Sequence, residues 1–292
     1  MLNLKPLKRN HREEPVSVYF NKELVRASLF GQMEFQSVLQ HVALLSRNEI
    51  VRVMNAYADA KMIFGYSETN RRSTGERYFE HVKGAALIDM LEFGNKDFEI
   101  IIAELHHDSK EDSLLFRGNE NHPRRRQSHL LIDSFSRLAA RYGERVAKII
   151  ECVTKPDKKG RMNSQQKELY LHAALGRVIS LYPEVRRESA QVKTCDAIHN
   201  NRTQKGSEEQ IAEKTIEKWR FYLPVSRFAG EIYYDKLRSE LKERLLQLEL
   251  RVPPEHDFGI VGFISSCTVR PPRCETLGFL LGLPGQRWSS PA

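Results

Sequence analysis

The stretch AELHHDSKED, residues 103–112, decides how the rest of the chain is interpreted. It follows an apolar run and contains an adjacent His107-Asp108 pair. A second acidic pair, Glu111-Asp112, comes three and four positions after Asp108, so on a helix these carboxylates share one face. Burying such a helix end is costly unless a partner offsets the lost hydration, and a divalent metal ion is a common partner. The stretch therefore predicts a buried helix that ends in a metal site.

The segments on both sides of this stretch also have helical patterns. Ser46 and Glu49 have the spacing of a capping box, and Ser207 and Gln210 have it again before a later helix. No segment alternates with a period of two, so we predict an all-α fold. The expected helices cover about residues 47–62, 81–93, 100–112, 165–181, 185–204, 208–219 and 229–250, with two more on either side of Tyr142-Gly143.

Composition indicates a soluble globular protein, since 40% of the residues are hydrophobic and 29% are charged. No apolar run approaches the roughly 20 residues of a membrane helix, and the first residues lack the apolar core of a signal peptide. Cys152 and Cys195 lie in apolar helical patterns, so we expect free, buried thiols. These features predict a cytoplasmic protein without a membrane partner.

Three regions of the chain differ in composition. Residues 1–37 show no sustained period and are expected to be an N-terminal extension. Residues 38–250 carry the helical patterns and form the predicted domain. From residue 251 to 292 the chain is rich in Pro, Gly, Cys and Ser, which predicts a loosely packed tail. The formal net charge of +8 permits a nucleic acid, but equally a polyanionic small molecule such as a nucleotide.

Two further places offer metal ligands. His81 lies at the start of one expected helix, and Asp196 lies on another, where it shares a face with His199 and Asn200. Two imidazoles and two carboxylates from three helices make a mixed nitrogen and oxygen site. Such a donor set fits a divalent ion such as Mn²⁺ better than it fits the zinc ion of thiolate sites. We expect His199 to support the site and do not count it as a ligand.

At this point the sequence resembles a known family. The ordered set formed by His81, His107-Asp108 and Asp196 resembles the HD-domain phosphohydrolases. Four blocks narrow the resemblance to the hydrolase domain of the RelA/SpoT family, over roughly residues 40–225, and four blocks in the right order make a chance match improbable. The blocks are residues 72–81, 107–112, 153–155 and 196–203.

The resemblance implies an HD-domain helical bundle that removes pyrophosphate from the 3′ position of the alarmone (p)ppGpp with Mn²⁺ or another divalent ion. By position, it assigns the metal to His81, His107, Asp108 and Asp196. It assigns the attacking water and the leaving group to Glu111 and Asp112. It assigns substrate binding to Arg72, which would pack against guanine, and to Asn200, Arg202 and Thr203 around the nucleoside.

Two alternatives stay open from the sequence. The first is an HD phosphohydrolase for another nucleotide, such as NADPH or a deoxynucleotide, because Arg77, Ala197 and Asn201 depart from the family pattern. The second is a non-enzymatic binder of nucleotides or nucleic acid, which the positive charge favours. A pure binder has no need of a metal set followed by Glu111-Asp112, so we expect a nucleotide substrate and no nucleic-acid partner.

Overall fold

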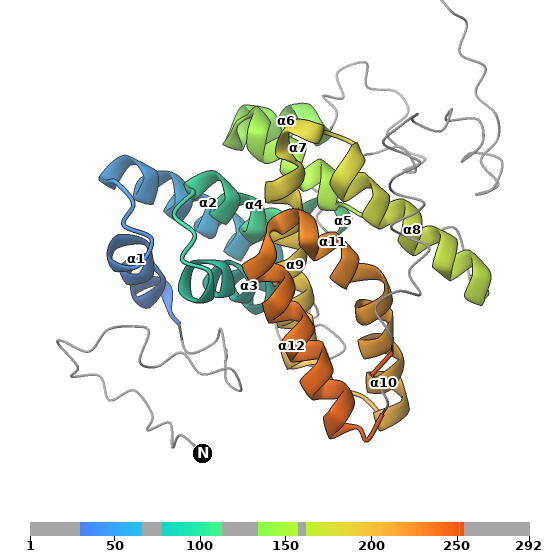
Figure 1. Ribbon diagram of the computed structural model, residues 1–292. Helices are drawn as coiled ribbons and strands as arrows, with labels where there is room; N and C mark the ends of the chain where they lie inside the picture. The colour runs from blue at the N-terminus through green and yellow to red at the C-terminus, as the bar shows by residue number, and fades with distance from the viewer. Residues whose placement is uncertain (1–29, 66–77, 113–133, 157–161, 251, 254–292) are drawn as a thin grey trace, which may run out of the picture.

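The computed structural model of the chain describes residues 30–65, 78–112, 134–156, 162–250 and 252–253 (Figure 1). Within these ranges the protein is all-α, as predicted, and contains no strand. Arg72, the basic loop at 117–127, most of the N-terminal extension and nearly all of the tail lie outside the described residues. The helices are α1 (Gln32–His41), α2 (Arg47–Gly65), α3 (Tyr78–Glu92), α4 (Phe98–His106), α5 (Ser109–Asp112), α6 (Ser134–Tyr142), α7 (Glu144–Val153), α8 (Ser164–Ser180), α9 (Arg186–Thr203), α10 (Glu208–Glu217), α11 (Leu223–Ala229) and α12 (Glu231–Gln247).

Several helix ends follow directly from local sequence signals. The backbone N–H of Ser46 donates to Glu49 Oε2 at 2.8 Å before α2, which completes the predicted capping box. The predicted box at Ser207 is also present before α10. Gly143 has a φ of +105°, a conformation that strains other residues, and it separates α6 from α7 as expected.

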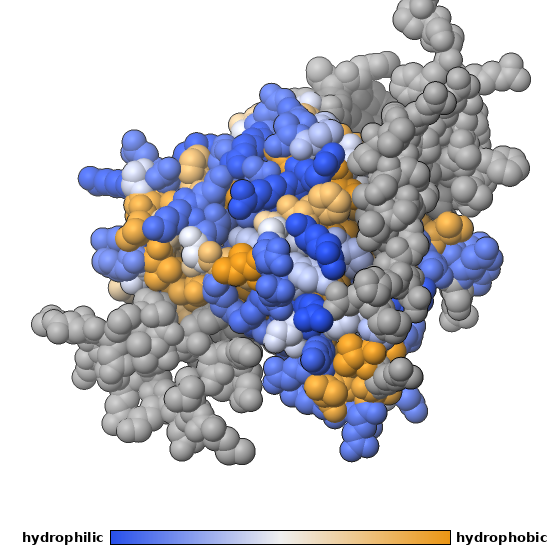
Figure 2. All heavy atoms as spheres, viewed as in Figure 1, coloured by the Kyte–Doolittle hydropathy of each residue, from blue (hydrophilic) through white to orange (hydrophobic). Residues whose placement is uncertain are grey.

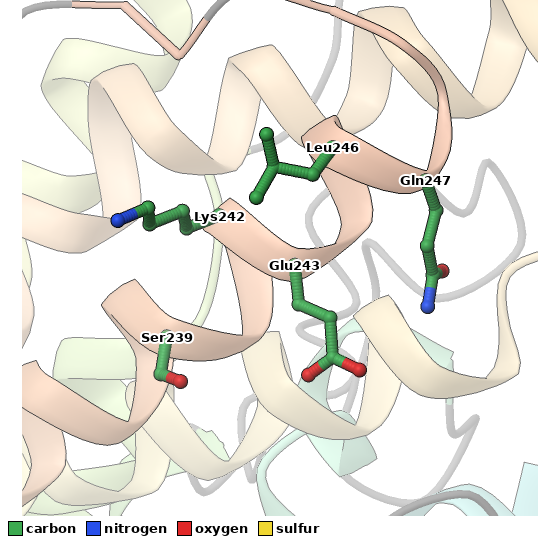
Figure 3. Close-up of a pocket in the computed structure, with 5 residues that line it drawn as sticks. All are labelled: Ser239, Lys242, Glu243, Leu246 and Gln247. Atoms are coloured by element: carbon green, nitrogen blue, oxygen red, sulfur yellow. The ribbon is translucent and has the colours of Figure 1, made fainter.

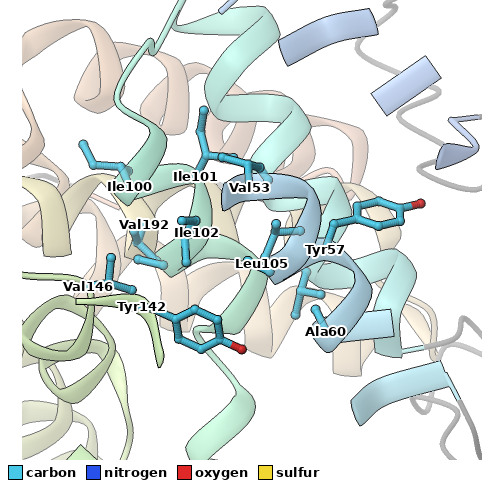
Figure 4. Close-up of a cluster of buried hydrophobic side chains, with 14 of the residues drawn as sticks. Val53, Tyr57, Ala60, Ile100, Ile101, Ile102, Leu105, Tyr142, Val146 and Val192 are labelled. Carbon is cyan, nitrogen blue, oxygen red and sulfur yellow. The ribbon is translucent and has the colours of Figure 1, made fainter. Parts of the chain in front are cut away.

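The first hydrophobic core surrounds α4. Its three consecutive isoleucines, Ile100–Ile102, and Leu105 are buried among α2, α7 and α9 (Figure 4). Val53 and Tyr57 contribute from α2, Val146 from α7 and Val192 from α9, while Phe35 of α1 belongs to the same core. The helix is apolar around most of its circumference because it is packed on several sides. The N-terminal boundary expected at residue 37 was therefore wrong, since it falls inside a helix that packs on the core.

Helix α9 lies at the centre of the molecule (Figure 1). It packs against α3, α4 and α7 on the first core and against α8, α11 and α12 on the second. Although α9 is polar in composition, most of its side chains are buried, including Lys193, Asp196 and His199. Buried polar groups are costly unless they are paired, so a central helix of this kind indicates a functional site.

The structure differs from the sequence expectation along the central stretch and near the C-terminal end. The helix expected from 100 to 112 is broken, because α4 ends at His106 and α5 begins at Ser109. The expected helix through Trp219 ends earlier at Glu217 and continues as a π-helical segment, Lys218–Tyr222. In π-helices the hydrogen bonds span one residue more than in an α-helix, which no sequence signal here predicted.

The exterior of the described body is mixed. Figure 2 shows hydrophilic residues over most of the coloured face, with apolar residues in small groups between them. None of the described helices combines the length and the apolar character needed to cross a membrane.

Candidate metal centre

Three segments bring the predicted metal ligands together. His81 is on the first part of α3, His107 and Asp108 form the turn after α4, and Asp196 is in the middle of α9. All four side chains are buried, with at most 9% of any residue exposed. The break between α4 and α5 falls at His107-Asp108, so the two ligands are presented by a turn and not by a continuous helix face.

The donor atoms of His81, His107 and Asp108 lie within 4.8 Å of one another, and Asp196 Oδ1 lies beside the two imidazoles. The Nε2 atoms of His81 and His107 lie 3.2 Å apart. Asp108 places one carboxylate oxygen 3.5 Å from His81 Nε2 and the other 3.4 Å from His107 Nε2. Asp196 Oδ1 lies 3.3 Å from His81 Nε2 and 3.8 Å from His107 Nε2. These spacings match neighbouring donors on one ion, since bonds of roughly 2.0–2.2 Å place adjacent ligand atoms about 3–3.5 Å apart.

The other ring nitrogens fix how the imidazoles face the cluster. His107 Nδ1 lies 2.7 Å from the backbone carbonyl of Glu104, which can only accept, so Nδ1 carries the proton. His81 Nδ1 lies 3.0 Å from Nδ1 of His199, which holds the His81 ring from behind. Both Nε2 atoms therefore face the cluster, with each Nδ1 in contact on the far side, an orientation typical of metal-ligating histidines.

The carboxylates in the cluster remain ionised despite burial. Burial alone raises the pKa of Asp108, but the imidazoles of His107 and His81 outweigh it and hold that pKa well below its usual range. Burial likewise acts to raise the pKa of Asp196, whereas Lys193 and the two imidazoles hold it well below the usual value. Two carboxylates and two imidazoles are a suitable donor set for a divalent cation.

His199 and Gly84 are two parts of the centre that sequence reasoning undervalued or missed. His199 is fully buried and was expected only as a supporting residue, which is the position it occupies behind His81. Gly84 lies one helical turn after His81, and a Cβ at Gly84 would lie 2.3 Å from the His199 ring. Glycine is therefore needed where α3 meets α9. A lone Gly inside an apolar helical pattern was the available signal for this contact.

The acidic residue that follows the turn faces a lysine on another element. Glu111 Oε1 accepts a hydrogen bond of 2.7 Å from the backbone N–H of Lys155, and its Oε2 lies 3.8 Å from Lys155 Nζ. Burial lowers the pKa of Lys155, but Glu111 outweighs this effect and holds the pKa well above its usual value. Glu111 and Lys155 therefore form a charged pair beside Asp108. Asp112 ends α5, and its side chain lies outside what the structure describes.

A second lysine adjoins the cluster on α9. Lys193 is 3% exposed, and its Nζ lies 3.1 Å from Asp196 Oδ2. Burial acts to lower the pKa of Lys193, yet Asp196 reverses the shift, so the ammonium stays charged. Lys193 is therefore not a solvated surface charge.

The predicted substrate-binding residues on α9 have different surroundings. Asn200 Nδ2 donates to Asp196 Oδ1, and Thr203 Oγ1 donates to the carbonyl of His199 at 2.9 Å. Arg202 makes bidentate ion pairs with Glu92 of α3 and Glu240 of α12, and its side chain is only 7% exposed. The guanidinium is thus committed to holding three helices together. This pairing differs from the expectation that Arg202 binds substrate, because position in a motif does not reveal which way a helix residue points.

One surface hollow lies on α12 and shares no residue with the metal cluster (Figure 3). Its lining carries one lysine and one glutamate, with no histidine or cysteine. The lining residues are Ser239, Lys242, Glu243, Leu246 and Gln247.

The described residues form an all-α body in which His81, His107 and Asp108 are a buried group that could hold a metal ion, and Asp196 Oδ1 lies 3.3 Å from His81 Nε2. No family model matches the chain. A curated protein of Aquifex aeolicus (strain VF5), named guanosine-3′,5′-bis(diphosphate) 3′-pyrophosphohydrolase, is 28% identical over 244 residues. The match covers 76% of this chain and 30% of that protein, so the chain spans less than a third of its relative's length. The chain is therefore similar to one part of a hydrolase, and this distant likeness supports a related hydrolase activity.

Proposed function

We propose that this protein is a Mn²⁺-dependent phosphohydrolase that removes pyrophosphate from the 3′ position of (p)ppGpp, leaving GDP or GTP. The observation that carries the proposal is the buried group of His81, His107 and Asp108, with the Asp196 carboxylate beside both imidazoles. The name of the Aquifex relative supplies the substrate class. We also propose that the helical body of the chain is the catalytic domain. The proposed compartment is the cytoplasm.

The proposed ligands are His81, His107, Asp108 and Asp196, whose donor atoms fit Mn²⁺ or a similar divalent ion. When bound, such an ion offsets negative charge on a phosphoryl group and makes a water molecule more acidic. The chain's part is to fix the donors. Glu104 and His199 hold the two imidazole rings, and Lys193 holds the Asp196 carboxylate.

Glu111 is the proposed general base, and Asp112 is proposed to assist it. Glu111 lies about one turn after Asp108, and the backbone N–H of Glu111 donates to the Asp108 carbonyl at 3.1 Å. A carboxylate within hydrogen-bond reach can orient a water molecule and accept its proton. Lys155, held charged beside Glu111, then offers its ammonium to the oxygens of the departing pyrophosphate.

The nucleoside part of the substrate is proposed to lie toward the C-terminal end of α9. Asn200 and Thr203 are half-buried there, and Asn200 also bonds the ligand Asp196, so substrate and metal positions are linked. Arg72 is proposed to stack on guanine through its planar cation. Arg202 has no part in this assignment beyond fixing the end of the helix.

The proposal is tested by incubating metal-depleted protein with Mn²⁺ and a set of nucleotides while separate assays follow pyrophosphate and phosphate. We expect pyrophosphate from ppGpp and pppGpp, none from GDP or GTP, and loss of turnover in excess chelator. Asp196→Asn protein from the same purification is the control for contaminating hydrolases. If the protein releases phosphate from NADPH, or phosphate or pyrophosphate from a deoxynucleotide, and does not turn over ppGpp, then that nucleotide is the substrate and the proposed one is wrong. Full turnover after metal removal verified by elemental analysis would contradict the mechanism.

A further inference from the structure

A second group of possible ligands lies in the interior next to the first. Asp89 of α3, Glu104 of α4 and Cys195 of α9 place one donor atom each within 4.8 Å of one another. All three residues are fully buried. The two groups adjoin, because Cys195 precedes Asp196 and the Glu104 carbonyl binds His107. The proposed hydrolase activity assigns no role to these three side chains.

Glu104 is the least satisfied of them. Neither of its carboxylate oxygens has a hydrogen-bond partner among the described residues. The polar groups beside the carboxylate are the Cys195 thiol and the Asp89 carboxylate. A carboxyl group buried without a partner is strongly destabilising, so its retention in a packed core indicates a ligand that completes the group.

Asp89 is already oriented as a ligand would be. The hydroxyl of Tyr233 on α12 donates to Asp89 Oδ1 at 2.7 Å, and Asn95 Nδ2 donates to Oδ2. Hydrogen bonds of this kind fix the direction of a ligating carboxylate and recur around protein metal sites. Oδ1 also accepts a hydrogen bond from the Cys195 thiol, so it has a lone pair for a metal ion once that thiol loses its proton.

The spacing between sulfur and oxygen agrees with a tetrahedral ion. Cys195 Sγ lies 3.7 Å from Asp89 Oδ1. Bonds of about 2.3 Å to sulfur and about 2.0–2.2 Å to oxygen place tetrahedral neighbours roughly 3.5 Å apart. One thiolate with two carboxylates favours a borderline ion such as Zn²⁺ over Mn²⁺, because sulfur is a poor ligand for hard cations.

We propose that Asp89, Glu104 and Cys195 form a second, structural metal site that takes Zn²⁺ and joins α3, α4 and α9 behind the catalytic centre. Ion binding removes the proton from the thiol and supplies the partner that Glu104 lacks. The site also reaches α12 through Tyr233. It stands independently of the hydrolase activity, because none of its ligands belongs to the His81, His107, Asp108 and Asp196 set.

Cobalt is the probe, because a Co²⁺–thiolate bond gives an intense charge-transfer band in the near ultraviolet and the first site contains no sulfur. The full chain is produced in cobalt-supplemented minimal medium, purified without chelator and analysed for metal content and absorption. We expect about two cobalt ions per chain and the thiolate band. In Cys195→Ser we expect the band to disappear and the cobalt content to fall to about one ion per chain. Cys152→Ser changes the other buried free cysteine and should keep the band and both cobalt ions.

Three further variants decide the assignment if Cys195→Ser fails to fold. A chain carrying Cys152→Ser, Cys267→Ser and Cys274→Ser leaves Cys195 as its one thiol, and we expect it to keep the band. Glu104→Gln should lower the metal content of folded protein by about one ion per chain, whereas His107→Gln should lower it without removing the band. Folded, cobalt-loaded parent protein without the band would overturn the proposal, as would a band that survives Cys195→Ser. The three groups would then be protonated core residues.

Discussion

Gly84 leaves room for the ring of His199, since a Cβ at that position would lie 2.3 Å from both Cδ2 and Nε2 of the imidazole. His199 in turn holds His81 through a contact of 3.0 Å between their Nδ1 atoms. One missing methyl group on α3 therefore sets the orientation of a proposed metal ligand.

Gly84→Ala should displace His199 and leave His81 without its support. Losing an outer partner of a ligating histidine costs roughly 10–100-fold in metal affinity, so we expect Mn²⁺ binding to weaken by that factor. Calorimetric titration of metal-free protein measures it. Gly176→Ala in α8 is the matched control, because no atom lies within 4 Å of a Cβ there and the change should stabilise the helix slightly. Equal Mn²⁺ affinity in parent and Gly84→Ala would show that the His199 contact has no influence on the metal.

Asp196→Asn should damage metal binding more than His199→Gln. The amide keeps the shape of Asp196 but removes the charge, leaving two histidines and one aspartate, a set that binds hard divalent ions weakly. His199→Gln removes only the support of His81. Mn²⁺ affinities by calorimetry, with circular dichroism as the folding check, give the order. If Asp196→Asn binds Mn²⁺ like the parent and His199→Gln does not, then His199 is the ligand and Asp196 is not.

Glu111→Gln should keep the metal and lose turnover by roughly 10²-fold or more, the scale of a group that orients water or accepts its proton. The amide oxygen can still accept the hydrogen bond from the Lys155 backbone, so the local fold is preserved. Steady-state kinetics on ppGpp and metal analysis on the same sample separate the two effects. Asp112→Asn should behave similarly. Parental turnover in both variants would reduce the acidic pair to a solvated helix end.

Arg202→Gln should lower stability while leaving KM for ppGpp nearly unchanged. It breaks a buried ion pair with Glu92 and Glu240, whose side chains are 9% and 10% exposed and keep Lys236 as a partner, so we expect a loss of at most about 3–5 kcal/mol. Urea unfolding measures the difference. Arg220→Gln is the control, because its pair with Glu168 is about half exposed on both sides and should contribute no more than about 1 kcal/mol. A large rise in KM at parental stability would return Arg202 to the substrate site.

Because of Lys218, we expect the folding stability of the protein to change with pH in the alkaline range. Burial disfavours its ammonium and lowers its pKa from 10.5 to about 8, although Nζ donates to Gln204 Oε1 at 2.9 Å. Between about pH 8 and 10.5 the unfolded chain holds more protons at this residue, so folding stability rises with pH by at most roughly 1.4 kcal/mol per unit. Denaturation at several pH values, compared with Lys218→Met, isolates the effect. Parallel curves for the two proteins would contradict it.

Local signals predicted much of the fold. Capping boxes at Ser46 and Ser207 and the glycines after α3 and α6 each act through neighbouring residues, so their effects could be read without the structure. The turn at His107-Asp108 could not be predicted, because helical spacing on both sides hides a break imposed by packing and ligand geometry. The π-helical segment before Pro224 is a tertiary adjustment of the same kind.

The site was predictable where residue type and order carry the chemistry, as for His81, His107, Asp108 and Asp196. It was not predictable where function depends on a contact across helices. A lone Gly signals a close contact, but the sequence does not show that Gly84 faces His199 or that Arg202 faces Glu92 and Glu240. Glu104 is buried within an apolar run of α4, and its neighbours Asp89 and Cys195 are apparent only in three dimensions.

The central position of α9 has a consequence for the order in which the chain leaves the ribosome. His81 and His199 are 118 residues apart, so the nascent chain carries His81, His107 and Asp108 long before Asp196 is translated. Until α9 docks, these three donors have neither the fourth carboxylate nor the ring that orients His81. α9 also packs on both hydrophobic cores, so the same docking event closes the interior and completes the ligand set. A truncated product that stops before α9 therefore has most of the motif and no site.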